Sequence, residues 1–151
     1  MISQELVGRC GIYCGACIIY RAERDHEQAR IDIANQHHCQ IEQVTCQGCG
    51  GLTEACWCHG CKILACLDEK GYRYCHECSS FHEKTCEIHQ HLANIYTKMG
   101  VDLRENLLRI QEGHVDQWLE EQNQKHRCVV CHHPLSVWDS SCPSCGHNIK
   151  K

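Results

Sequence analysis

The sequence is poor in the residues that usually build an apolar core. It holds one phenylalanine and two prolines in 151 residues, and aromatic residues make up only 6% of it. Leucine, isoleucine, valine and phenylalanine together number 30, close to the ~20% level below which an apolar core alone rarely stabilises a domain. We therefore expect another interaction to supply part of the folding free energy.

Long apolar runs are also missing. Residues 1–10 lack the basic start and apolar stretch of an export signal, and no segment approaches the ~18 apolar residues of a membrane-spanning helix. The formal net charge is −4, with no cluster of Lys and Arg that could bind phosphate groups. We expect a cytoplasmic protein that binds neither a membrane nor nucleic acid.

Cysteine is the abundant residue. There are 17 cysteines, nine of them between residues 46 and 86, and six pairs have the spacing C-x-x-C. That spacing lets two thiolates of one turn reach the same metal ion, and Gly48 and Gly60 suit such turns because glycine readily adopts positive φ. A cytoplasmic protein keeps its thiols reduced, so we interpret them as metal ligands and not as disulfides. A structural zinc contributes on the order of 10 kcal/mol to folding, enough to offset a small core.

Apolar residues recur at helical spacing in much of the remaining sequence. Ser80 and Glu83 have the spacing of a capping box, and Gly71 and Gly100 have the position of helix ends. We interpret the apolar stripes as surfaces on which helices pack together. The patterns predict helices over residues 18–38, 62–70, 80–99, 102–112 and 115–124.

The C-terminal cysteines form the most specific pattern in the sequence. Cys128-x-x-Cys131 and Cys142-x-x-Cys145 are separated by ten residues, which is the ligand spacing of a zinc ribbon. Residues 135–138 are predicted to form the strand between the two knuckles. The second knuckle is also typical of rubredoxins, so iron is an alternative to zinc at this site.

A tetrahedral site needs four ligands, and sixteen of the cysteines divide into four such sets in chain order. Cross-braced pairing, in which neighbouring sets exchange cysteines, stays open for all but the last set. Cys56 is left over and could replace Cys39. A histidine could also replace a thiolate, the candidates being His59, His76 and His82. The sets are Cys10, Cys14, Cys17 and Cys39; Cys46, Cys49, Cys58 and Cys61; Cys66, Cys75, Cys78 and Cys86; and Cys128, Cys131, Cys142 and Cys145.

Iron is an alternative at Cys10, Cys14 and Cys17 as well. Their C-x-x-x-C-x-x-C spacing can provide three corners of a zinc site, or it can hold three irons of an iron–sulfur cluster. The helix predicted after them is strongly charged, which favours zinc because clusters are commonly shielded by apolar residues. In total, the sequence predicts three or four zinc ions.

The order of these motifs resembles that of a prokaryotic cysteine-rich family known only as a domain of unknown function. The segments that carry the resemblance are C-G-I-Y-C-G-A-C at 10–17, C-Q-G-C at 46–49, W-C-H-G-C-K at 57–62 and Y-C-H-E-C at 74–78, with 100–107, 118–122 and the C-terminal knuckles resembling longer members. Cys39 and Cys56 lie outside the family pattern. The resemblance implies a small cytosolic zinc-binding protein without an established activity.

Together these observations predict a small metal-dominated protein, mainly α, with irregular zinc-knuckle loops and a C-terminal β zinc ribbon. The expected domains are a cysteine-rich multi-zinc domain over residues 1–100, a helical connector over 101–125 and the ribbon over 126–151. Because closed four-thiolate sites are typical of structural zinc, we predict a non-enzymatic module that contacts an unidentified protein partner. The alternative is a small iron–sulfur or rubredoxin-like protein for electron transfer or redox sensing.

Overall fold

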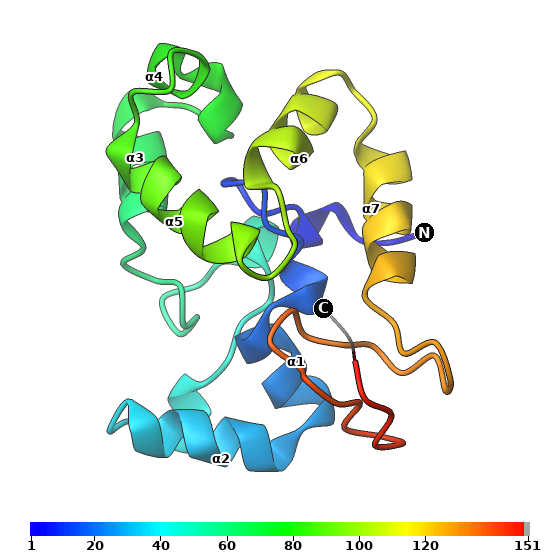
Figure 1. Ribbon diagram of the computed structural model, residues 1–151. Helices are drawn as coiled ribbons and strands as arrows, with labels where there is room; N and C mark the ends of the chain where they lie inside the picture. The colour runs from blue at the N-terminus through cyan, green and yellow to red at the C-terminus, as the bar shows by residue number, and fades with distance from the viewer. Residues whose placement is uncertain (150–151) are drawn as a thin grey trace.

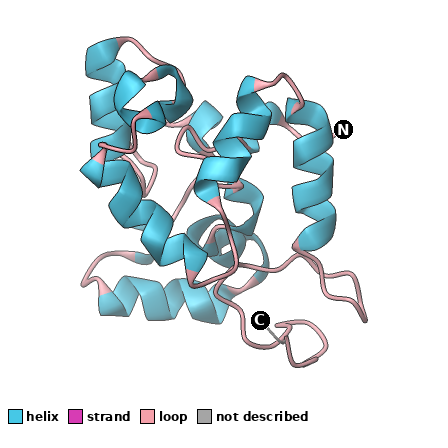
Figure 2. Cartoon of the chain, turned by 45° about the horizontal axis from the view of Figure 1, so that its top comes forward, coloured by secondary structure: helices cyan, strands magenta, loops and turns pink. Residues whose placement is uncertain are grey.

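The computed structural model describes residues 1–149, and these residues form seven α-helices and no β-strand (Figures 1 and 2). The longest helices have 11 residues, and no helix in the described part of the chain has both the length and the apolar character needed to cross a membrane. The helices are α1 Ile18–Asp25, α2 Glu27–Gln36, α3 Lys62–Lys70, α4 Ser79–His82, α5 Glu87–Thr97, α6 Leu103–Gln111 and α7 Val115–Lys125.

The largest apolar cluster joins the N-terminal segment to α5, α6 and α7. Leu103 of α6 and Trp118 of α7 are fully buried, and Val7 and Tyr13 of the N-terminal segment pack with them. The edge of the Tyr13 ring meets the Trp118 ring, with centroids 6.3 Å apart. In Figure 1 the N-terminal segment accordingly runs between α6 and α7. Residues far apart in the sequence thus share one core, which positions the first cysteine loop.

Asn106 of α6 connects this loop to α7 through two buried hydrogen bonds. Its Nδ2 donates to the carbonyl oxygen of Gly11 at 2.9 Å, and its Oδ1 accepts from Nε1 of Trp118 at 3.0 Å. Gly11 has φ of 97° and lies so close to α6 that an added Cβ would sit 2.4 Å from the carbonyl oxygen of Leu103. The loop therefore needs glycine at this position, where a larger residue would have both the wrong φ and no space.

Several predicted helix boundaries are confirmed. The Asp102 side chain caps α6 by accepting a hydrogen bond from the N–H of Glu105 at 3.0 Å. Gly71 ends α3 in the left-handed conformation with φ of 70°. These signals are local, because each depends on a side chain or a backbone angle at the helix end itself.

Two other helix predictions are wrong in detail. The helix expected over residues 18–38 is divided into α1 and α2 at His26, whose φ is −147° and whose Nδ1 accepts from the N–H of Ala29 to cap α2. The predicted capping box at Ser80 does not start the long helix. The chain instead forms the short α4, passes through Lys84 at φ of 60°, and begins α5 at Glu87. A residue at positive φ cannot lie inside a right-handed helix.

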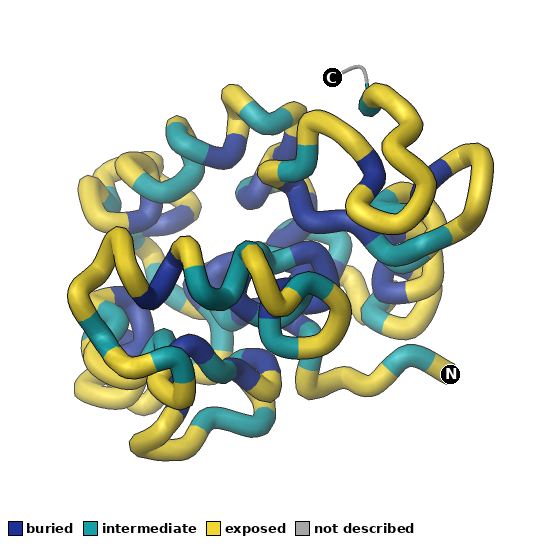
Figure 3. The backbone as a smooth tube through the Cα atoms, turned by 90° about the horizontal axis from the view of Figure 1, so that it is seen from below, coloured by how far each residue is buried: buried dark blue, intermediate teal, exposed yellow. Residues whose placement is uncertain are grey.

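The predicted β ribbon is wrong, because the described C-terminal segment contains isolated bridges and no strand. Residues 127 and 134 pair once, as do 141 and 148. In the segment expected to be a strand, the N–H of Val137 donates to the carbonyl oxygen of Ala16 at 3.0 Å, and the Val137 side chain joins the main core. Most of the surrounding segment is exposed (Figure 3). Within the predicted strand, the N–H of Leu135 donates to the carbonyl oxygen of His126 in the same C-terminal segment, while that of Val137 binds the N-terminal half. The division into domains stays a prediction.

Replacing Asn106 with alanine should lower the free energy of unfolding by about 2–6 kcal/mol, because each of its two buried partners loses a hydrogen bond worth roughly 1–3 kcal/mol. Urea unfolding at a fixed metal concentration measures the effect. Asn94→Ala, at an exposed position of α5, is the control and should change the stability by less than about 0.5 kcal/mol. Equal unfolding midpoints for the two variants would contradict the bridging role of Asn106.

Candidate metal centre

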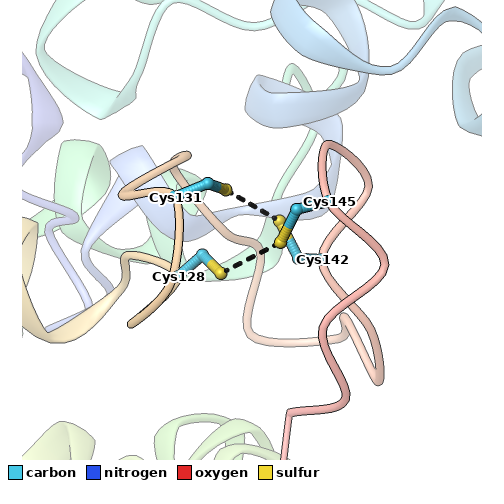
Figure 4. Close-up of side chains that lie close together, drawn as sticks. All are labelled: Cys128, Cys131, Cys142 and Cys145. Carbon is cyan, nitrogen blue, oxygen red and sulfur yellow. Dashed lines mark hydrogen bonds between the residues drawn. The ribbon is translucent and has the colours of Figure 1, made fainter.

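The four C-terminal cysteines come together as one cluster (Figure 4). Their sulfur atoms all lie within 4.8 Å of one another. The Sγ atoms of Cys128 and Cys145 are 3.6 Å apart, as are those of Cys131 and Cys142. Four thiolates around a zinc ion at about 2.3 Å stand roughly 3.8 Å apart, so the cluster fits a tetrahedral metal ion with little movement.

Two backbone turns of the same kind present these cysteines. In each turn, the N–H of the first cysteine donates to the carbonyl five residues later, and the N–H of the residue four positions later donates back to the cysteine carbonyl. The distances are 2.9 and 2.9 Å at Cys128, and 2.8 and 2.9 Å at Cys142. The returning donor is His132 in one turn and Gly146 in the other, with φ of 60° and 74°. His132 thus takes the position for which glycine is the usual residue.

The electrostatics of the cluster favour a bound cation. Hydrogen bonds from the backbone N–H groups of Cys131 and Val130, with Cys145 as a further donor, lower the pKa of Cys128 to about 6. The N–H of His147 also lowers the pKa of Cys145, but partial desolvation by the surrounding atoms and the three neighbouring cysteines outweigh it and raise that pKa to about 12. Four thiols this close cannot all ionise without a positive charge between them. A metal ion supplies that charge, and backbone N–H donors to sulfur are typical of such sites.

The remaining predicted ligands are arranged differently. All 17 cysteines are free of disulfides, but within residues 1–149 only the C-terminal set has three or more ligand atoms all within 4.8 Å of one another. The third predicted set lines one pocket between α3, α4 and α5, where Nζ of Lys70 donates to Sγ of Cys78 at 3.5 Å. The ligand roles of these residues stay predictions. The cysteines that line the pocket are Cys66, Cys75, Cys78 and Cys86.

The first two predicted sets are mixed with each other in space. The thiol of Cys14 donates to Sγ of Cys49, which helps to raise the pKa of Cys14 and lowers that of Cys49 to about 7. The thiol of Cys58 likewise donates to Sγ of Cys46 and lowers the Cys46 pKa to about 6. The first contact joins the two predicted sets, whereas the second lies within the predicted set of Cys46, Cys49, Cys58 and Cys61.

The two cysteines outside the family pattern take no part in these hydrogen bonds. Cys39 packs at the edge of the apolar cluster that contains Val44 and Cys46, against which Cys17 also packs. Cys56 is buried, and its Sγ accepts a hydrogen bond from the N–H of Thr53 at 3.4 Å. The role of Cys39 as the fourth ligand of the first set stays a prediction.

Changing Cys142 to serine should remove one metal ion from the protein, because a buried corner of the C-terminal site is lost. The metal content of purified protein, measured by mass spectrometry, gives the count. Ser144→Ala changes an exposed residue of the same knuckle that is not a ligand, and it should retain every ion. An unchanged metal count for Cys142→Ser would contradict the C-terminal metal site. The loss of two or more ions would show that the metal sites share ligands.

Comparison with known proteins confirms the family resemblance. Residues 6–91, more than half of the chain, match the model of the family described as "Protein of unknown function (DUF3795)". No curated protein matches the chain. No solved structure matches it either. The matched residues begin before the first cysteine loop and end within α5, so they include the whole cysteine-dense segment. The chain belongs to the DUF3795 family of proteins of unknown function.

Proposed function

We propose that this protein is a cytoplasmic, non-enzymatic module that binds several zinc ions and contacts a partner protein through its C-terminal site. The closed four-cysteine cluster carries the proposal. Four thiolates fill a tetrahedral coordination sphere, which leaves no position at which a substrate or a reactive water could bind. A closed site of this kind stabilises a fold and shapes a surface, whereas catalytic zinc sites keep one position open.

The surface beside the cluster supports a role in protein contact. Val129 and Val130 stand at the tip of the first knuckle with 79% and 60% of their surface exposed, and Trp138 is 42% exposed. A hollow beside Val129 is lined by Leu135 and Ile149. Exposed apolar side chains next to a recess are favourable for binding another protein, because burying each one removes apolar surface from water.

Electron transfer by bound iron is the second candidate function. Cys131 and Cys145 are exposed at the site, while Cys128 and Cys142 are buried. An iron ion held by these four sulfurs would therefore lie near the surface, where an electron could pass to a partner. The spacing of the ligands suits both metals, so the identity of the metal distinguishes the two functions.

Purification without oxygen, followed by metal analysis and an absorption spectrum, tests the proposal. We expect zinc and no visible absorption, because zinc bound by four thiolates is colourless. Stoichiometric iron with absorption in the visible range would overturn the zinc module and establish the electron-transfer candidate. A protein without bound metal would contradict both functions.

Changing Val129 and Val130 together to serine should weaken partner binding at least tenfold without loss of metal, because both side chains are exposed and neither is a ligand. Quantitative cross-linking in the native cells, with wild-type and variant proteins at equal abundance, measures the contact. Ile88→Ser is the matched control, since it removes another exposed apolar side chain, 44% exposed, on α5. If the double variant forms cross-links from the knuckle to the same partners in the same yields as the wild type, this surface does not bind the partner.

A further inference from the structure

The segment that carries Cys49 lies directly against the N-terminal segment. Gly48 has φ of 93°, and a Cβ added there would lie 2.4 Å from the carbonyl oxygen of Glu5; a Cβ at Gly50 would lie 2.6 Å from the Cα of Glu5. The N–H of Arg9 donates to Sγ of Cys49. Cys49 is therefore held beside the first cysteine loop by backbone contacts on both sides of it.

Cys14 completes this contact from within the first loop. Its Sγ accepts from the N–H of Cys49 and its thiol donates to the Cys49 sulfur. Cys10 is close enough to Cys49, Cys75 and Cys61 for their charges to affect its ionisation, and Cys75 also lines the pocket of the third predicted set. Cys61 also packs against the apolar cluster that contains Cys10. The sulfurs that surround Cys10 thus come from both halves of the cysteine-rich region.

Cys46 is fixed at a different place, on the helix that follows the first loop. Oε2 of Glu23 accepts from the N–H of Cys46 at 3.1 Å, and Nη1 of Arg24 donates to the Cys46 carbonyl at 3.1 Å. Both residues lie on α1, and Cys17 is the residue that immediately precedes this helix. Cys17 and Cys46 accordingly belong to the same apolar cluster. The helix therefore holds Cys46 beside Cys17, whereas the turn that carries Cys49 lies against the N-terminal segment.

Cys58 joins Cys46 and Cys17. The N–H of Trp57 donates to the carbonyl oxygen of Thr45 at 2.8 Å, which places Cys58 beside Cys46. The Cys58 thiol donates to Sγ of Cys46, and the charge of Cys17 also acts on it. The charge of Cys49 acts on Cys58 as well, but less than the charges of Cys46 and Cys17.

We propose that two N-terminal metal ions are held by cross-braced ligand sets: Cys10, Cys14, Cys49 and Cys61 bind one ion, and Cys17, Cys46 and Cys58 supply three thiolates to the other. Each C-x-x-C pair of this region then divides its two cysteines between the ions. This differs from the sets read in chain order. The inference rests on the proposed function only in that the chain binds metal. Since no three of these sulfurs lie within 4.8 Å of one another among the described residues, the loops close further when an ion binds.

Two double variants separate the cross-braced arrangement from the chain-order sets. Cys14→Ser with Cys49→Ser removes two ligands of one ion if the sets are cross-braced, so one ion should be lost; chain-order sets require the loss of two. Cys46→Ser with Cys49→Ser gives the opposite result, with two ions lost in the cross-braced arrangement and one in chain order. The metal count of full-length protein measures both. Cys128→Ser with Cys131→Ser is the matched control and should lose one ion.

A measurement on the unaltered sequence covers the case in which a variant fails to fold. The wild-type protein is loaded with cadmium-113, and correlations between the metal and the cysteine Hβ protons identify which cysteines share an ion. We expect Cys14 and Cys49 on one resonance, and Cys46 and Cys58 on another. Cys46 and Cys49 on the same resonance, or all of these cysteines on one resonance, would overturn the cross-braced arrangement and leave the proposed function standing. A chain that binds no metal would instead overturn the proposed function.

Discussion

The fold depends on the buried amide of Asn106, because this side chain holds together elements that a small apolar core could not position alone. It binds the Gly11 carbonyl in the first cysteine loop and the Trp118 indole in α7. A buried polar group is favourable only when its hydrogen bonds are satisfied, and here both ends are. The result is a helical scaffold that fixes one end of the cysteine-rich region while the rest of that region is arranged by shorter contacts.

The parts of the fold that could be predicted are those whose signals are local. The Asp102 cap and the Gly71 helix end depend on neighbouring residues, so the sequence identifies them correctly. The packing of Val137 onto Ala16 depends on a distant segment. The interruption at His26 is a local cap, but an imidazole nitrogen makes it, and histidine is not one of the usual capping residues. Alternation of apolar and polar residues over 135–138 suits a strand, yet it equally suits an extended segment that buries one side chain in a core. Pattern alone could not distinguish the two.

The same distinction applies to the cysteines. The C-terminal cluster could be predicted because its ligands lie within a short segment and repeat one backbone turn. That His132 adopts the positive φ usual for glycine could not be predicted. The N-terminal contacts depend on Glu23 and Arg24, which the sequence presents as ordinary charged residues of a solvated helix face. Their role becomes visible only when the N–H and carbonyl of Cys46 are found against them. Spacing predicts which residues can bind metal, but it does not predict which of them share an ion.

The length of chain between ligands explains why the two halves need different support. Ten residues separate Cys131 from Cys142, whereas 34 separate Cys14 from Cys49. Loop-closure entropy grows with the logarithm of length, so the longer loop costs about 1 kcal/mol more. The hydrogen bonds from α1 to Cys46, each worth about 1 kcal/mol, are sufficient to offset that difference. The local C-terminal site can therefore form from its own turns, while distant N-terminal cysteines require the scaffold that Asn106 and α1 provide.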